Sequence, residues 1–208
     1  MSAATDMLMD RSARVSHPSS RRRLVSAGVG AFLASTALRV PARAGAADAG
    51  PLHRPWSRPT PPLALPLHDG GGRWSLDEAR GLVVVLNFWA GWCEPCRTEM
   101  PSLELFAQRH ERDGLVVMAV NHRETDAAID RFLAQMPISL PILRDVDGAA
   151  ARDWGVRMFP TTVLVGRDGR ARFSVIGEAD WLAPAIRTLL APLLAESGAS
   201  RFASKEKS

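Results

Sequence analysis

Residues 87–96 read Asn87-Phe88-Trp89-Ala90-Gly91-Trp92-Cys93-Glu94-Pro95-Cys96 and contain both cysteines of the 208-residue chain. The overlapping run, Leu82 to Phe88, is valine-rich and apolar apart from Asn87, which is typical of a central strand buried on both faces. Helical periodicity follows from Glu94 to about Arg112 and is interrupted by Pro101. The sequence therefore predicts that the cysteine pair lies between a buried strand and the first turn of a helix.

This placement has a chemical consequence for the two sulfur atoms. A thiolate at a helix N-terminus lies at the positive end of the helix dipole and beside unpaired N–H groups, which lower its pKa. Cys93 is the predicted exposed nucleophile, and Cys96, one turn later, is the predicted resolving thiol. Attack of Cys93 on a disulfide would form a mixed disulfide, which Cys96 then releases. Pro95 stiffens this turn at an early helical position, where its missing N–H costs no hydrogen bond.

Two structural roles for the pair are weaker alternatives. A zinc site would need two further ligands, usually a second cysteine or histidine pair. The histidines of the predicted body show no paired spacing: His53, His68, His110 and His122. A purely structural disulfide would close a loop of two intervening residues, which is too small to add much stability. We therefore predict a redox-active disulfide, Cys93–Cys96, with no metal and no other cofactor.

The segments around this unit alternate between strand and helix patterns. Further strands are predicted at 63–67, 73–76, 115–121, 140–143, 161–165 and 171–176. Further helices are predicted at 125–136, 147–154 and 179–195. The last two strands are joined by Arg167-Asp168-Gly169-Arg170, in which Asp-Gly is a strong hairpin signal. This order predicts an α/β fold with a mixed central sheet, helices on both faces and an N-terminal β extension.

The net charge of +4 comes from the N-terminal segment. Residues 1–44 contain seven of the 26 basic residues and two of the 22 acidic residues. The remaining residues therefore carry 19 basic and 20 acidic side chains, a net charge of −1. Because the basic character lies outside the predicted folded body, the charge gives no support for nucleic-acid binding.

The same segment has the features of an export signal. Arg21-Arg22-Arg23 precedes an uncharged stretch from Leu24 to Leu38, and Ala42-Arg43-Ala44 is a small-x-small cleavage pattern. The uncharged stretch is shorter than the roughly 20 residues that a membrane-spanning helix needs. Ser20-Arg21-Arg22-Arg23-Leu24 also resembles a twin-arginine motif. We expect a periplasmic or other extracytoplasmic location, with the leader either cleaved or retained as a tether.

These patterns divide the chain into four regions. Residues 1–44 are the predicted twin-arginine-like export signal, and the Pro-, Ala- and Arg-rich residues 45–62 are a predicted flexible linker. Residues 63–195 are the predicted folded domain. The Ser-, Lys- and Glu-rich residues 196–208 are a predicted disordered tail.

The strand–Trp-Cys-x-x-Cys–helix unit resembles thioredoxin. Pro101, eight residues after Cys93, falls where the long active-site helix of that fold is kinked. Phe159-Pro160-Thr161-Thr162 resembles the loop whose cis-proline faces the cysteines. A cis X-Pro bond costs little and would let the preceding residue pair with an extended substrate. A trans turn proline at the start of a strand is the alternative for Pro160.

The chain is more closely similar to the TlpA/ResA group of exported reductases. The shared residues are Asn-Phe-Trp-Ala-x-Trp-Cys-x-Pro-Cys-Arg-x-Glu-Met-Pro at 87–101 and Pro-Thr-Thr at 160–162. An additional strand–helix segment, here about 125–155, is also characteristic of the group. The resemblance covers roughly residues 63–194, and it implies a thioredoxin-like domain at 63–195.

Asn87 stands where cytoplasmic thioredoxins carry an aspartate, and an amide cannot accept a proton. The group has a glutamate three residues after the second cysteine, which is Glu99 in this chain. The resemblance implies that Glu99 accepts the proton of Cys96. A partly buried carboxyl there would have a raised pKa, which suits acid–base work. The alternative is an exposed residue paired with Arg97 or Arg109.

Other residues of the predicted site have roles at its rim. Trp92 is expected to form an apolar edge next to the cysteines, whereas Trp89 is expected in the core. Glu94 either opposes the thiolate and makes the pair more reducing, or is a first-turn acid that the helix dipole favours. The predicted substrate groove consists of Trp92, Glu94, Pro95, Phe159, Pro160 and Thr161.

The expected function is reduction of disulfides in other exported proteins. The resemblance implies apocytochrome c or the cysteines of a copper-oxidase subunit as substrates, and a membrane thiol carrier as electron donor. One alternative is a disulfide-forming oxidant or isomerase. Another is a copper-carrying chaperone, although the spacing of Met100, Met118, Met136 and Met158 fits no ligand set. A monomer is the default for this fold.

Overall fold

The computed structural model describes residues 52–196. The predicted export signal at 1–44 and most of the predicted tail, 197–208, therefore lie outside the described residues. Within residues 52–196, no helix combines the length and the apolar character that a bilayer crossing requires.

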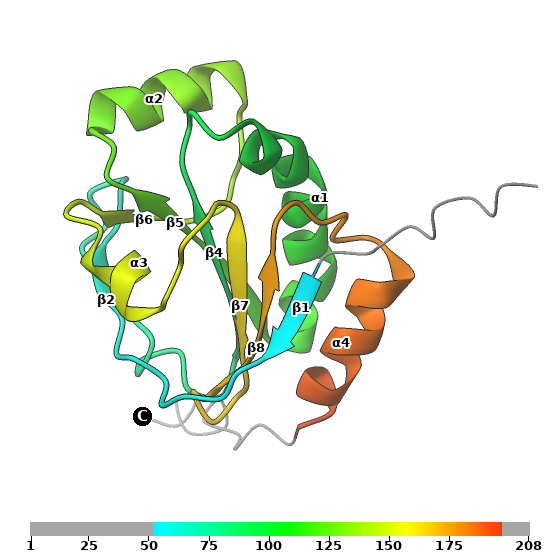
Figure 1. Ribbon diagram of the computed structural model, residues 1–208. Coiled ribbons are helices and arrows are strands. Elements are labelled where there is room, and N and C mark those ends of the chain that lie inside the picture. Colours follow the sequence, from blue (N-terminus) through cyan, green and yellow to red (C-terminus); the bar gives the residue numbers. More distant parts are fainter. Residues whose placement is uncertain (1–51, 197–208) are drawn as a thin grey trace, which may run out of the picture. The chain divides into compact units, whose positions relative to one another are not determined.

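Eight strands, four α-helices and one short 3-10 helix make up the described part of the chain (Figure 1). The strands are β1 Leu52–Pro55, β2 Ala64–Pro66, β3 Arg73–Ser75, β4 Val83–Trp89, β5 Leu115–His122, β6 Ile142–Asp145, β7 Thr161–Val165 and β8 Ala171–Ile176. The helices are α1 Glu94–His110, η1 Glu111–Asp113, α2 Asp126–Gln135, α3 Ala149–Asp153 and α4 Pro184–Ala195. These bounds follow the strand and helix patterns of the sequence closely from 63 to 176.

A mixed sheet of six strands in the order β1-β8-β7-β4-β5-β6 forms the centre. Strands β4, β5 and β6 are parallel, whereas β7, β8 and β1 each run antiparallel to their neighbour. All seven residues of β4 are buried, which agrees with its apolar pattern, broken only by Asn87. The loop after β4 therefore leaves the sheet at the carboxyl edge of a central strand, where α/β folds build their sites.

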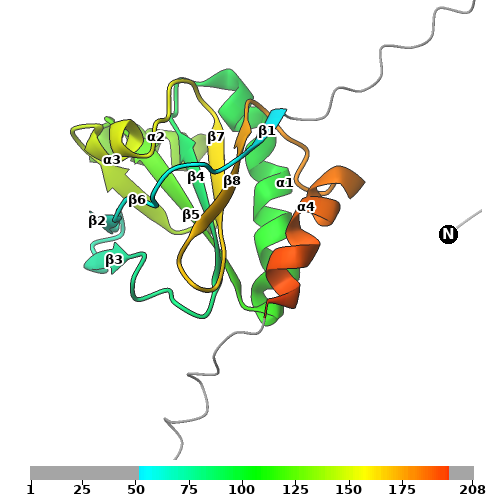
Figure 2. The ribbon, with the colours of Figure 1, turned by 60° about the horizontal axis from the view of Figure 1, so that its bottom comes forward.

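Helices cover both faces of this sheet (Figures 1 and 2). One face packs against α1 and α4, together with the apolar side of α2. The other face packs against α3 and the segment that contains the β2–β3 hairpin. This hairpin also reaches the outer strand of the sheet, because the His68 N–H donates to the Ile142 carbonyl at 2.9 Å and Leu67 bridges Leu143.

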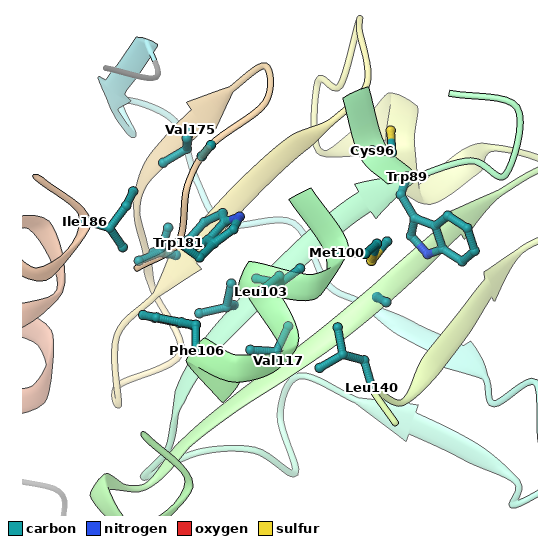
Figure 3. Packing of buried hydrophobic residues seen from close by; sticks show 14 of the residues in the cluster. Trp89, Cys96, Met100, Leu103, Phe106, Val117, Leu140, Val175, Trp181 and Ile186 are labelled. Carbon is teal, nitrogen blue, oxygen red and sulfur yellow. The ribbon is translucent and has the colours of Figure 1, made fainter. Parts of the chain in front are cut away.

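Helix α1 carries the second cysteine into the core. Cys96, Met100, Leu103 and Phe106 recur at helical spacing and are all buried against β4 and β5. Figure 3 shows these side chains following one another along the helix, with Cys96 at its beginning near Trp89. Pro101, which interrupts the helical pattern of the sequence, lies inside the continuous helix.

The prediction of a flexible linker at 45–62 is wrong for residues 52–62, the part that the structure describes. Leu52–Pro55 pairs antiparallel with β8, with Leu52 opposite Ile176. The ring of Trp56 then lies 5.6 Å from that of Trp154, and the Thr60 hydroxyl accepts a hydrogen bond from the Ala171 N–H at 2.8 Å. The segment is extended, as its composition predicts, but strand pairing and aromatic contacts hold it against the domain. The packed region therefore includes residues before Leu63, from the β1 pairing at Leu52–Pro55 onward.

The C-terminal helix is shorter than predicted and the packed region slightly longer. Helix α4 begins at Pro184, not at Ala179, because Ala179 and Trp181 donate their N–H groups to α1 side chains instead of forming a helical turn. Glu196, assigned to the tail, contacts the Arg172 guanidinium at 3.0 Å.

Candidate active site

The two cysteines lie where β4 gives way to α1. They form a disulfide, with Cys93 at the N-cap of the helix and Cys96 in its first turn. The Cys96 N–H donates to the Cys93 sulfur at 3.3 Å. Cys93 is 4% exposed and Cys96 is fully buried, so Cys93 is the more accessible sulfur but far less exposed than the sequence suggested. A thiolate at Cys93 would lie next to the free N–H groups of the helix start, which favour negative charge.

The loop before β7 forms the neighbouring wall. The Phe159–Pro160 peptide bond is cis, as the resemblance implied. Pro160 and Thr161 are buried, and the Thr161 hydroxyl donates to the Met158 carbonyl at 2.8 Å. The rings of Phe159 and Trp92 meet edge to face with their centroids 6.0 Å apart. This contact places the proline loop beside the residue that precedes Cys93.

The predicted rim residues lie at the surface. Trp92 is 69% exposed, while Pro95 and Glu94 are also exposed. The Glu94 carboxylate lies 3.7 Å from the Arg97 Nε atom, a solvent-accessible pair on the first turn of α1. Trp89, by contrast, is buried against Phe132, as predicted.

Glu99 is buried and its carboxylate is hydrogen-bonded inside the core. The alternative prediction, that Glu99 is exposed and paired with Arg97 or Arg109, is therefore wrong. Its carboxylate accepts hydrogen bonds from Asn87 Nδ2 at 2.7 Å, the Ala179 N–H at 3.1 Å and Trp181 Nε1 at 3.3 Å. Burial raises the pKa of Glu99 to about 7, a rise that the three hydrogen bonds oppose and the charge of Glu178 adds to. Desolvation outweighs the donors, so the carboxyl can exchange a proton near neutral pH.

Glu99 and Cys96 lie three residues apart on α1 and are both buried. Residues at this spacing occupy the same side of a helix, one turn apart. Asn87 reinforces the arrangement from β4, because its Nδ2 atom also donates to the Thr162 hydroxyl at 2.9 Å. The structure thus brings a titratable carboxyl to the helix face that carries the second sulfur.

Glu124 is a site residue that the sequence reasoning missed. Its carboxylate accepts hydrogen bonds from the Gly91 N–H at 2.6 Å and from Asn121 Nδ2 at 2.7 Å. Gly91 lies in the Trp-Cys loop, and a Cβ atom there would come within 3.1 Å of that carboxylate. The sequence did contain a signal for this residue. Glu124 follows shortly after β5, the buried strand that pairs with β4, and so lies at the same end of the sheet as the cysteine loop.

His122 is a second missed residue near the proline loop. Its ring centroid lies 4.8 Å from that of Phe159, and its Nδ1 atom is 3.6 Å from the Asp145 carboxylate. Asp145 is buried and accepts hydrogen bonds from the N–H groups of Ala150 and Ala151 at the start of α3. The insertion that contains β6 and α3 therefore supports the Phe159 side of the site.

The methionines considered as copper ligands do not gather at the cysteines. Met100 and Met118 are buried in clusters on opposite faces of the sheet, whereas Met158 is 53% exposed. Among residues 52–196, no group of three His, Cys, Asp or Glu side chains is placed to hold a metal ion.

Comparison with known proteins relates the chain to thioredoxin-like and thiol-disulfide proteins. The AhpC/TSA family matches residues 57–174. Over 108 residues the chain is 32% identical to the thiol-disulfide oxidoreductase ResA of Bacillus thuringiensis subsp. konkukian, a match that covers 52% of this chain and 62% of that protein. It is 39% identical over 102 residues to the thioredoxin-like protein YneN of Bacillus subtilis, covering 48% of this chain and 59% of YneN. The chain thus spans about 60% of the length of these curated relatives.

Solved structures share the same architecture. One is a Chlorobium tepidum protein assigned as the thiol:disulfide interchange protein DsbE, with 31% identity and a TM-score of 0.60 over 65% of this chain and 95% of that chain. StoA of Bacillus subtilis, at 23% identity, shares the fold with a TM-score of 0.52 over 60% of this chain and 93% of that chain. With its mixed sheet flanked by helices, the Cys93–Cys96 pair at a helix start and a family match over more than half its length, the chain belongs to the AhpC/TSA family of thioredoxin-like proteins.

Proposed function

We propose that the chain is an exported thiol–disulfide oxidoreductase that reduces disulfides in other extracytoplasmic proteins. The observation that carries this proposal is the Cys93–Cys96 pair at the start of α1, with the buried carboxyl of Glu99 on the same helix face. The names of the ResA relatives and of the DsbE-type neighbour support the same chemistry. Apocytochrome c and copper-oxidase cysteines remain the substrates implied by the resemblance.

The reduced protein would act in two thiol–disulfide exchanges. The Cys93 thiolate attacks one sulfur of the substrate disulfide, forms a mixed disulfide and releases the first substrate thiolate, which takes up a proton from solvent. Glu99 then accepts the proton of the Cys96 thiol. The Cys96 thiolate attacks the Cys93 sulfur, closes the Cys93–Cys96 disulfide and releases the second substrate thiolate. Two electrons pass from the cysteine pair to the substrate, and a membrane thiol carrier would return two electrons to the pair.

The raised pKa of Glu99 suits this role. A carboxyl with a pKa of about 7 is half ionised at neutral pH. It can take a thiol proton and give it up again without a large free-energy difference, which is the condition for effective acid–base catalysis. Asn87, which holds the aspartate position of cytoplasmic thioredoxins, serves here as a donor to Glu99 rather than as the base.

The reduction potential of the cysteine pair tests the direction of the reaction. The full chain is equilibrated with thiol–disulfide buffers of known potential, and tryptophan fluorescence reports the redox state because Trp92 adjoins Cys93. A value near ~−270 mV, as in thioredoxin, supports a reductant. A value near ~−120 mV would identify a disulfide-forming oxidant and refute the proposed direction. The Cys93→Ser and Cys96→Ser variants are the controls and should show no redox transition.

The export signal has its own test. Replacing Arg21 and Arg22 by Lys should trap the chain in the cytoplasm, because lysine keeps the charge but removes the twin-arginine pair. The corresponding change of Arg11 and Arg14 is the matched control. Equal amounts of both variants outside the cytoplasm would rule out the twin-arginine route.

A further inference from the structure

A groove of about 480 Å³ lies beside the proline loop, on the sheet face that α3 covers. Its floor is formed by Thr161 of β7 and by Ser174 and Ile176 of β8. One wall is the segment 54–58, which crosses these strands after β1 (Figure 2), and the other is the loop that follows α3. The predicted linker therefore forms one wall of this groove.

The groove is basic. Arg54, Arg58 and Arg157 line it, and no Asp or Glu does. Within the part of the chain that the structure describes, none of the three guanidinium groups lies within 4.0 Å of a carboxylate. The arginines thus concentrate positive charge on a body, residues 45–208, whose formal net charge is −1. Such a surface favours anionic groups and accelerates their arrival.

Arg58 is held in place rather than freely mobile. Its guanidinium lies 4.4 Å from the centre of the Trp56 ring, and that ring packs against the buried Trp154. The guanidinium also occupies the space beside Gly155, where a Cβ atom would come within 2.6 Å of the Arg58 Nη2 atom. Gly155 has a φ of +65°, so the turn after α3 and the position of Arg58 require the same glycine.

The groove adjoins the proline loop, which contacts the residue before Cys93. Two of its lining residues, Met158 and Thr161, flank the Phe159–Pro160 bond, and Phe159 contacts Trp92 beside Cys93. An extended chain that is joined to Cys93 and runs along the proline loop therefore reaches Arg157 and Arg54 a few residues from its cysteine. Met158, 53% exposed, adds an apolar contact at this entrance.

We propose that this groove binds acidic side chains flanking the reactive disulfide of the substrate protein, so that the chain selects substrates with Asp or Glu near the cysteines. This inference rests on the proposed function. A protein segment is the occupant to which we commit, because the groove is continuous with the proline loop along which a substrate must pass.

The test uses two synthetic peptides with one intramolecular disulfide, identical except that Glu or Lys residues flank the cysteines. The reduced full chain should reduce the acidic peptide with a kcat/KM about tenfold higher, since exposed ion pairs contribute up to about fivefold each. The preference should shrink as NaCl rises from 20 to 300 mM. The Arg54→Glu/Arg157→Glu variant should lose or invert the preference. The matched control Arg187→Glu, an exposed residue on α4, should keep it.

Reduction of the uncharged hydroxyethyl disulfide separates this inference from the proposed function. If the wild type does not reduce it, the proposed function fails. If the wild type and both variants reduce it equally but the peptide preference is unchanged in the groove variant, the inference alone fails. Sedimentation with phosphatidylglycerol vesicles that depends on Arg54 and Arg157, without a peptide preference, would assign the groove to lipid and also overturn it. Matching thermal unfolding midpoints confirm that the variants are folded.

Discussion

The side chains of Asn87 and Glu99 are joined by a hydrogen bond of 2.7 Å from Nδ2 to Oε1, which connects the central strand β4 to helix α1. The bond favours the ionised carboxyl, yet burial dominates and holds the pKa of Glu99 at about 7. The strand thus orients the carboxyl while the surrounding core sets its proton affinity.

Replacing Glu99 by Gln should slow closure of the Cys93–Cys96 disulfide by at least about tenfold at pH 7, because the resolving thiol loses the proton acceptor that we propose for it. The pH–rate profile should also lose its inflection near 7. Stopped-flow tryptophan fluorescence during reduction of a mixed-disulfide substrate measures both effects. Glu111→Gln, an exposed change in η1, is the matched control. Unchanged kinetics in the Glu99 variant across pH 5–9 would refute the role.

Stability should depend on pH through the same group. The pKa of Glu99 is raised from 4.5 to about 7 on folding, so the native state binds more protons than the unfolded state between these values. Its stabilising contribution is complete below about pH 4.5 and is lost as the pH rises to about 7. The wild type should therefore lose about 3 kcal/mol relative to Glu99→Gln across this window. Urea unfolding of both oxidised proteins at pH 4.5 and 8 measures the difference, and a constant gap would contradict it.

Trp181→Phe should shift the titration of Glu99 upward. The change removes the indole N–H that donates to the carboxylate at 3.3 Å and that favours its ionised form. We expect the inflection in the pH–rate profile to rise above 7 and the free energy of unfolding to fall by about 1–3 kcal/mol through lost packing. Trp154→Phe, on the opposite face, should destabilise the protein similarly but leave the inflection unmoved. An identical shift in both variants would refute a specific effect on Glu99.

Trp92 should matter for binding rather than for stability. It is 69% exposed, so Trp92→Ala should change the free energy of unfolding by less than about 0.5 kcal/mol. Its loss should raise KM for a peptide disulfide about tenfold, because exposed aromatic side chains beside a site are frequent binding anchors. Steady-state kinetics and chemical denaturation together provide the two readouts. A large loss of stability with unchanged KM would show that Trp92 is a packing residue.

Trp56→Ala should destabilise the domain by about 2 kcal/mol, since this half-buried ring packs on Trp154. His53→Ala, an exposed change in β1, should have little effect. Thermal unfolding distinguishes them, and equal midpoints for the wild type and Trp56→Ala would mean that the segment does not contribute to the fold.

The sequence predicts an element correctly where the residues of that element by themselves show whether it is buried or forms a turn. Strand β4 is apolar except at Asn87 because both faces are covered, and the Asp168-Gly169 turn joins β7 and β8 as predicted. Strand β1 has no such pattern, because its partner is more than 100 residues away, with Leu52 opposite Ile176. No local periodicity encodes that pairing.

The residues of the candidate site likewise fall into two groups, those that the sequence predicts and those that only the folded chain brings together. Cys93 and Cys96 follow from spacing alone, and Glu99 follows from the resemblance. Glu124 did not emerge, because its contact with the Gly91 N–H depends on two loops that meet only after β4 and β5 pair. The non-helical turn at Ala179 and Trp181 was also missed, since it exists only because α1 accepts those N–H groups.

The β2–β3 hairpin also protects one edge of the central sheet. Its contacts with Ile142 and Leu143 lie against the outermost parallel strand of the sheet. A bare strand there would offer a template on which a partly unfolded client could add as a further strand and lead to aggregation. By covering this flank, the hairpin removes that template, so a polypeptide substrate of the proposed function would meet the chain at its cysteine pair rather than at the edge of its sheet.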